Sequence, residues 1–185
     1  MSTLYVDSIQ PKTTGSTISY GGQMFQQWQL PNTLQLTGNT TTTLTTWVKS
    51  SDQTFGVTGA SAGIVPEVGA SMSTSSGIFT FPVTGIYKLE YHVMGSCDGG
   101  ARLYIGGRIE ATVDNSNYST IGSSLQGGYA NGHRTDSNLQ MFFNVTNTST
   151  HKIKTVVRHA DTVYVEGTTA EINTSIIFTR LGAAS

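Results

Sequence analysis

The amino-acid sequence predicts an all-β protein, an antiparallel β-sandwich, and two observations carry that prediction. Helix-favouring residues are scarce, with 5 Lys and 5 Glu against 29 Thr and 21 Gly, and β-branched Thr favours strands. Short β-branched and aromatic runs with a period of two are separated by clusters of Gly, Asn, Asp and Ser, as in strands joined by turns. Many short strands at such spacing are typical of a sandwich.

Nine segments fit this strand pattern. They are residues 43–48, 77–81, 86–94, 101–105, 109–113, 139–145, 152–158, 162–166 and 174–181. In the clearest of them, alternation places Tyr87 and Tyr91 on an apolar face and Lys88 and His92 on a polar face, because successive side chains of a strand point to opposite sides. We expect the apolar face to belong to the core or to a buried interface.

Two later features refine this prediction. Gly106-Gly107 lies between two of the segments and is typical of a two-residue hairpin turn. The last segment is apolar on both faces, with Phe178 opposite Ile177, and a strand of that kind is usually covered on both sides. We therefore expect it to be a central strand.

Charge and composition exclude several classes of function. A net charge of −1 offers no cluster of cations for a phosphate backbone or an anionic membrane surface, so we expect neither nucleic acid binding nor membrane insertion. The chain has no apolar run long enough for a membrane span and no apolar stretch of a secretory signal at its start. A single cysteine, Cys97, excludes an internal disulfide framework.

Residues 1–42 differ from the rest of the chain, because Gly and Pro interrupt every apolar run. Such a segment cannot bury a core alone, yet it is too apolar for a solvated tail. We therefore predict an N-terminal docking arm over 1–42 and a head domain over 43–185. The apolar residues expected to dock on another chain are Leu4, Val6, Ile9, Phe25 and Trp28.

The head resembles the jelly roll shared by tumour necrosis factor and the globular heads of the first complement component. The residues that carry the resemblance are 77–93, with the turn Pro82-Val83-Thr84-Gly85, and the segments 103–107, 161–165 and 176–181. The sequence departs from that family at Ala160, where Gly is usual, and in a long polar stretch over 114–137. The resemblance implies a homotrimer, in which one face of the sandwich packs against two further copies.

The start of the chain, residues 1–11 followed by 14–18, resembles the opening of tail-fibre and other virion proteins of tailed bacteriophages. That resemblance implies a virion protein made in the host cytoplasm. It also implies that other virion proteins are partners of residues 1–42.

No catalytic, cofactor or metal site is expected. The four histidines are not spaced as metal ligands, and the acidic residues do not form the close pair that acid and base catalysis requires. The segment Asp114-Asn115-Ser116-Asn117 has oxygen donors suited to calcium, although the same residues favour a turn. We expect the turn.

Lys152, Lys154 and Arg158 fall on one face of a predicted strand. They either form a small basic patch or are the solvated side of an edge strand, where lysines are common. We favour the second interpretation, because it applies more often to such a pattern.

The sequence therefore predicts a non-enzymatic, homotrimeric virion appendage whose head recognises a host surface glycan or an outer-membrane component. The alternatives are a capsid decoration protein and a soluble ligand like complement or a cytokine. The aromatic residues expected at the trimer interface are Tyr87, Tyr91, Tyr164 and Phe178, and a receptor-facing loop over 114–136 is expected to present Tyr118 and Tyr129.

Overall fold

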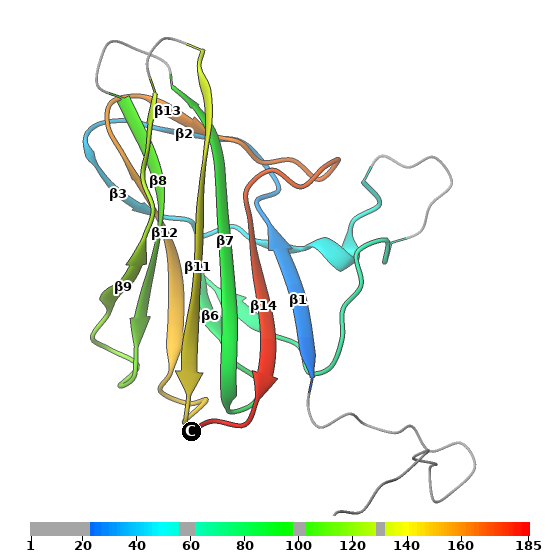
Figure 1. Cartoon of the computed structure of the whole chain (residues 1–185). Coiled ribbons are helices and arrows are strands. Elements are labelled where there is room, and N and C mark those ends of the chain that lie inside the picture. Colours follow the sequence, from blue (N-terminus) through cyan, green and yellow to red (C-terminus); the bar gives the residue numbers. More distant parts are fainter. Residues whose placement is uncertain (1–22, 56–61, 98–102, 129–131) are drawn as a thin grey trace, which may run out of the picture.

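Two antiparallel sheets of seven strands each pack face to face in a computed structural model of the chain (Figure 1). The structure describes residues 23–55, 62–97, 103–128 and 132–185. Leu4, Val6, Ile9 and Tyr129 lie outside these residues. Within the described residues, no helix is long and apolar enough to cross a membrane. The predicted all-β sandwich is confirmed.

The first sheet, sheet A, is built around the long strand β7. Strand β11 pairs with one edge of β7 along almost its whole length, while β14 and β13 share the other edge. Strand β1 pairs with β14, so β14 is a central strand as predicted. The strands are β1 (Met24–Gln29), β2 (Leu34–Leu36), β4 (Val48–Lys49), β7 (Gly85–Cys97), β11 (Arg134–Val145), β13 (Val163–Val165) and β14 (Ser175–Gly182).

The second sheet, sheet B, is built around β8 and β12. Strand β12 pairs with β8 on one edge and with β6 and β3 on the other, while β9 and β10 pair with the outer edge of β8. Strand β5 pairs with β6, and the 3-10 turn η1 (Ser50–Asp52) follows β4. The strands are β3 (Thr40–Thr43), β5 (Ser73–Ser75), β6 (Ile78–Thr80), β8 (Leu103–Thr112), β9 (Ser119–Ser123), β10 (Gln126–Gly128) and β12 (Lys152–His159).

The core between the sheets is rich in aromatic side chains. Phe79 packs at 5.0 Å from Phe178 and at 5.6 Å from Trp28 between ring centroids, and Phe81 packs at 4.7 Å from Tyr87. The Tyr87 hydroxyl donates to the Val83 carbonyl at 2.8 Å. Contacts of this kind stabilise a core beyond the burial of area alone.

Three of the four aromatic residues predicted at a trimer interface lie in this core. Tyr87, Tyr91 and Phe178 are at most 1% exposed within the single chain, so they cannot contact a second copy, and this part of the prediction is wrong. Alternation along a strand separates two faces, but it does not say which of them meets the second sheet of the same chain.

The boundary predicted at residue 42 also needs correction. Residues 24–29 form β1, which pairs with β14, and β2 and β3 pair with β13 and β12. Trp28 is 6% exposed and belongs to the core, while Phe25 is half-buried on the outer side of sheet A. Residues 24–43 are therefore part of the sandwich and not of a docking arm.

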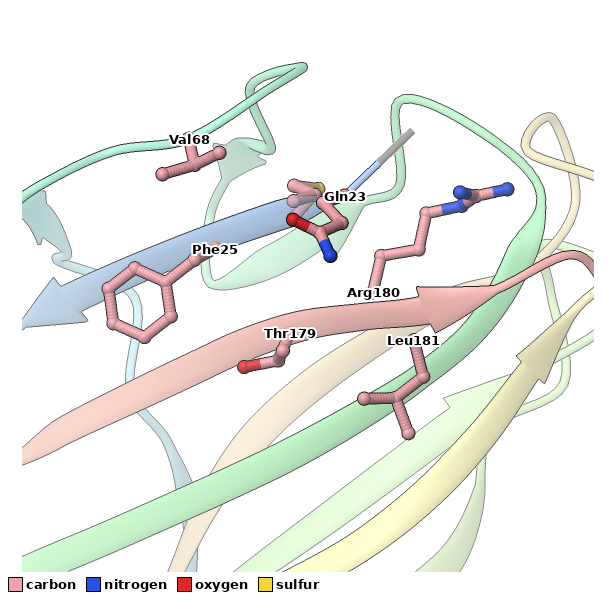
Figure 2. Close-up of a pocket in the computed structure, with 7 residues that line it drawn as sticks. Gln23, Phe25, Val68, Thr179, Arg180 and Leu181 are labelled. Atoms are coloured by element: carbon pink, nitrogen blue, oxygen red, sulfur yellow. The ribbon is translucent and has the colours of Figure 1, made fainter. Parts of the chain in front are cut away.

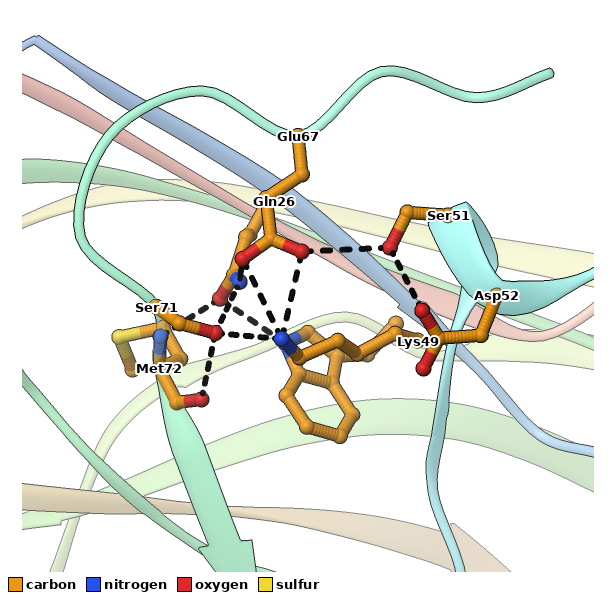
Figure 3. A network of polar contacts seen from close by, with 8 residues as sticks. Gln26, Lys49, Ser51, Asp52, Glu67, Ser71 and Met72 are labelled. Carbon is orange, nitrogen blue, oxygen red and sulfur yellow. Dashed lines mark hydrogen bonds and ion pairs between the residues drawn. The ribbon is translucent and has the colours of Figure 1, made fainter. Parts of the chain in front are cut away.

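A polar network anchors β1 to the loop that precedes β5 (Figure 3). Gln26, 1% exposed, accepts a hydrogen bond from the Met72 backbone at 2.7 Å and donates to Ser71 at 2.8 Å. Glu67 contacts the Gln26 amide and pairs with Lys49 at 3.2 Å. These partners satisfy a buried amide, which explains how an amide-rich strand can be an integral part of the sandwich.

Gly106 and Gly107 lie within the continuous strand β8 and not in a hairpin turn, so that prediction is wrong. A Cβ atom at Gly106 would lie 2.2 Å from the Ser124 carbonyl oxygen, and one at Gly107 would lie 3.0 Å from the Tyr91 ring. Glycine is used here for close approach of backbone and ring. The predicted strand 43–48 is likewise broken, because β3 ends at Thr43 and β4 begins at Val48.

Candidate functional site

The outer side of sheet A, which we call the open face, carries the side chains of β11, β7, β14 and β1 that point away from the core. On β7 these side chains are half-buried, in strict alternation with buried ones. The strand pairing arranges the open face in straight rows. One row runs from Phe142 through Lys88 and Thr179 to Phe25, and Phe25 in turn bridges to Val68.

This row is unusually apolar at both ends. Phe142, on β11 at the edge of the sheet, is 65% exposed, and Val68 at the other end is 46% exposed. Leu181, on β14 beside the row, is 56% exposed. Phe25, Val68, Thr179 and Leu181 line a hollow of about 320 Å³ (Figure 2). Contiguous exposed apolar side chains are typical of an interaction site.

The middle of the open face is polar but nearly neutral. Lys88 and Glu90 form an ion pair at 2.9 Å, and Gln140 donates to Glu90 at 3.0 Å. Ile177 lies in the same row, between Glu90 and Gln27. Charged residues are depleted at the centre of interfaces between protein chains, so the mutual pairing of Lys88 and Glu90 makes this region more compatible with a contact.

At the other end of the open face His92 lies beside Asp136. The His92 Nε2 atom is 3.7 Å from the Asp136 carboxylate, and Nδ1 is 2.8 Å from the Asn173 carbonyl oxygen. With both ring nitrogens facing these oxygens, His92 has no position left to activate a serine as a general base does. Tyr164, the fourth predicted interface residue, lies nearby in a row with Ser96 and Gln35, and its hydroxyl accepts a hydrogen bond from Gln35 at 3.1 Å. It stays a candidate interface residue.

Chemistry of other kinds finds little support in the described part of the chain. It contains no group of three or more His, Cys, Asp or Glu side chains that could hold a metal ion. Cys97 is buried, and burial raises the pKa of its thiol, which lowers its reactivity as a nucleophile.

The stretch 114–136 is different from the loop that the sequence predicts, because most of its described residues lie in β9, β10 and the start of β11. Tyr118 is half-buried, and the Lys154 ammonium lies 4.7 Å from its ring centroid. The Asp114 carboxylate accepts hydrogen bonds from Asn117, Ser116 and Thr112, and these hold its pKa well below the usual range. Asp114 therefore organises a turn, as expected.

Comparison with known proteins shows the fold. No family model and no curated protein matches the sequence. Among solved structures, mouse APRIL aligns with a TM-score of 0.58 and 13% identity, over 86% of this chain and 99% of its own. The Eiger TNF of S. frugiperda aligns with a TM-score of 0.59 and 12% identity, over 89% of this chain and 96% of its own. The head is a jelly roll of the tumour necrosis factor type, as predicted.

Proposed function

We propose that the chain is a non-enzymatic binding protein whose jelly-roll head assembles into a homotrimer through the open face of sheet A. The observation that carries this proposal is the row from Phe142 to Phe25, which has an exposed aromatic side chain at one end and an apolar hollow at the other. This face points away from sheet B, so it is free to contact another chain.

A ring of identical chains requires two different complementary patches on each chain, since every interface joins one patch to the other. Phe142 and the hollow beside Phe25 meet this requirement, because they lie in one row at opposite sides of the sheet. With the threefold axis parallel to the strands, the side chains of this row lie at the same height along the axis in every copy. Phe142 of each copy then enters the hollow of the next.

Burial makes such an interface favourable. Phe142 is 65% exposed in the single chain, and full burial of a phenylalanine side chain contributes about 1.5–3 kcal/mol. The ion pair between Lys88 and Glu90 neutralises the centre of the face, so that few isolated charges lose their water when the copies meet.

The biological setting that the comparisons favour is a ligand of the tumour necrosis factor type, because mouse APRIL and the Eiger TNF share the fold. A second candidate is the predicted virion appendage, which residues 1–11 favour through their resemblance to bacteriophage virion proteins. Mass spectrometry of purified virus particles separates the two. Detection of the chain in the particles supports the appendage, and its presence only in the surrounding medium supports the ligand.

A cysteine pair tests the proposed interface directly. The variant Gln140→Cys/Gln27→Cys keeps the Phe142 ring and places two thiols at opposite ends of the neighbouring row, with β7 and β14 between their strands. They are about 14 Å apart within a chain, which is too far for a disulfide. Oxidation is expected to yield a covalent trimer of the double variant and none of either single variant. Identical behaviour of the double and single variants would contradict the proposed contact.

A further inference from the structure

Basic side chains gather on the outer side of sheet B, on the opposite side of the molecule from the open face. Strands β8 and β12 carry four cations on this side, one of them exposed and three half-buried, with Glu110 as the one carboxylate on these two strands. The whole chain, by comparison, has a net charge of −1. We call this surface the basic face, and its cations are Arg108, Lys152, Lys154 and Arg158.

Protection of a sheet edge does not explain these cations. Lysine on an edge strand prevents pairing with other molecules, but β12 pairs with β8 on one side and with β6 and β3 on the other. The favoured interpretation of the sequence, that these residues are the solvated side of an edge strand, is therefore wrong. The cations lie in the middle of the sheet, where another reason for them is needed.

Neighbouring groups hold all four cations in place. The Arg108 guanidinium lies 3.9 Å from the Glu110 carboxylate, and the Lys152 ammonium donates to the Thr148 carbonyl oxygen at 2.8 Å. The Lys154 ammonium lies 2.9 Å from Glu110 and 4.7 Å from the Tyr118 ring centroid. The Arg158 guanidinium lies 5.3 Å from the ring centroid of Tyr104. Side chains that are already ordered lose less conformational entropy when a ligand binds.

The basic face also has a regular spacing. Alternate residues of a strand are about 6.6 Å apart, so Lys152 and Arg158 bracket about 20 Å of surface. Hydroxyl side chains line the neighbouring positions, because Thr80 pairs with Lys152, Thr41 with Arg158 and Ser123 with Arg108. The surface thus alternates positive charges with hydroxyl groups.

We propose that the basic face binds an acidic polysaccharide, a chain of sulfated or carboxylated sugars lying along β12. The cations complement the acid groups, and the Thr and Ser hydroxyls complement those of the sugars. A nucleic acid fits the surface less well, because single strands bind through bases stacked on free aromatic rings. On this face Lys154 and Arg158 already cover the rings of Tyr118 and Tyr104.

This inference deepens the proposed binding function and names its partner, but it does not depend on self-association. The basic face and the open face lie on different sheets (Figure 1), so a trimer would present three basic faces outward. Three linked sites bind a polymer more tightly than one, by as much as 10²- to 10⁴-fold where geometry allows.

The test is binding of the full-length chain to immobilised sulfated dextran, polygalacturonate and neutral dextran at several NaCl concentrations. We expect binding to at least one acidic polymer, and the polymer that binds identifies the acid group. The variant Lys152→Gln/Arg158→Gln should bind about tenfold or more weakly, since each exposed ion pair contributes up to about fivefold. Its salt dependence should be shallower by about 0.7 in log–log slope for each lost contact, as for single-stranded polyanions.

The matched control is Lys12→Gln, which removes one positive charge from the N-terminal segment, outside both the basic face and the open face; its binding should equal that of the wild-type chain. Equal binding of the double variant and the wild type, equal binding to neutral dextran, or binding to duplex DNA with none to either acidic polymer would overturn the inference. Light scattering of each sample reports the oligomeric state separately. A monomer that binds would contradict the proposed trimer alone, and a trimer that does not bind would contradict this inference alone.

Discussion

Phe142 and Phe25 lie at opposite ends of one cross-strand row on the outer side of sheet A. Phe142 is paired with Lys88, Lys88 with Thr179 and Thr179 with Phe25. The first ring is 65% exposed, and the second lines a hollow of about 320 Å³. The exposed Phe142 side chain and the hollow lie in the same row, and they are the two complementary patches that a cyclic assembly of identical chains needs.

Phe142→Ser should weaken self-association and leave the fold intact. The lost burial of one aromatic side chain is worth about 1.5–3 kcal/mol for each interface, which corresponds to a roughly tenfold to hundredfold weaker contact. Analytical ultracentrifugation over a range of concentrations measures this change. The control is Val113→Ser, since Val113 is 62% exposed but follows β8 of the other sheet. Equal dissociation of both variants would contradict the proposed role of Phe142.

Gly106→Ala should destabilise the sandwich, although the site lies in a strand and not in a turn. The new Cβ atom would lie 2.2 Å from the Ser124 carbonyl oxygen, and the forced shift of backbone should cost about 1–3 kcal/mol. At Gly127, in β10 of the same sheet, a Cβ atom meets nothing within 4 Å, so Gly127→Ala is the control. Denaturant titration compares the two variants, and equal midpoints would refute the close approach.

Deletion of residues 1–22 should leave a folded protein, whereas deletion of residues 1–42 should not. The longer deletion removes β1 and β2, and with them Met24 and Trp28, which are 1% and 6% exposed. Loss of a single buried Trp side chain costs about 3–5 kcal/mol, against a total stability of about 5–15 kcal/mol. Circular dichroism and denaturant unfolding compare the two products. Cooperative unfolding of the fragment 43–185 would restore the boundary predicted at residue 42.

Glu67→Gln should make the free energy of unfolding depend less on pH in the acid range. Burial acts to raise the pKa of Glu67, but hydrogen bonds from Ser71, Lys49 and Gln26 outweigh it and leave this pKa lowered. A lowered pKa in the folded state means that the contribution is present above the ordinary Glu pKa and is lost as the pH falls through the lower folded value. The free energy of unfolding, measured from pH 7 downward, should decline less steeply below about pH 4.5 in the variant than in the wild type. Parallel profiles would contradict the role of this carboxylate.

Local pattern predicts much of the fold. The alternation from Tyr87 to Val93 correctly identifies the two faces of β7, because the period of a strand depends only on backbone geometry. The apolar residues on both sides of 174–181 likewise predict the central position of β14. In both cases the signal lies within a few consecutive residues.

Contacts between distant residues could not be predicted in this way. Gln26 and Gln29 are buried because the first binds the Met72 backbone 46 residues away and the second the Thr168 carbonyl 139 residues away. Without knowledge of those partners an amide-rich segment predicts exposure to solvent, and the sequence therefore assigns β1 to an arm. The role of Gly106 could not be predicted for the same reason, since its close neighbour Ser124 lies on a different segment.

The sequence predicts that an interface between copies exists, but it does not identify the residues of the candidate site. The resemblance to tumour necrosis factor implies a trimer, but three of the four aromatic residues that the sequence predicts at its interface are buried in the core, and only Tyr164 is not. Phe142 carried a signal that could have identified it, namely an aromatic residue on the polar side of a strand whose other side bears Leu139, Met141 and Phe143. Exposed aromatic residues of that kind point to an interface more directly than those of the apolar side.

The mass of the purified full-length chain in solution at micromolar concentration tests the central claim most directly. Size-exclusion chromatography with multi-angle light scattering is expected to give three times the single-chain mass of 19.7 kDa, and Phe142→Ser to shift that mass downward on dilution. A wild-type chain that elutes with the mass of one copy at every concentration would contradict assembly through the open face.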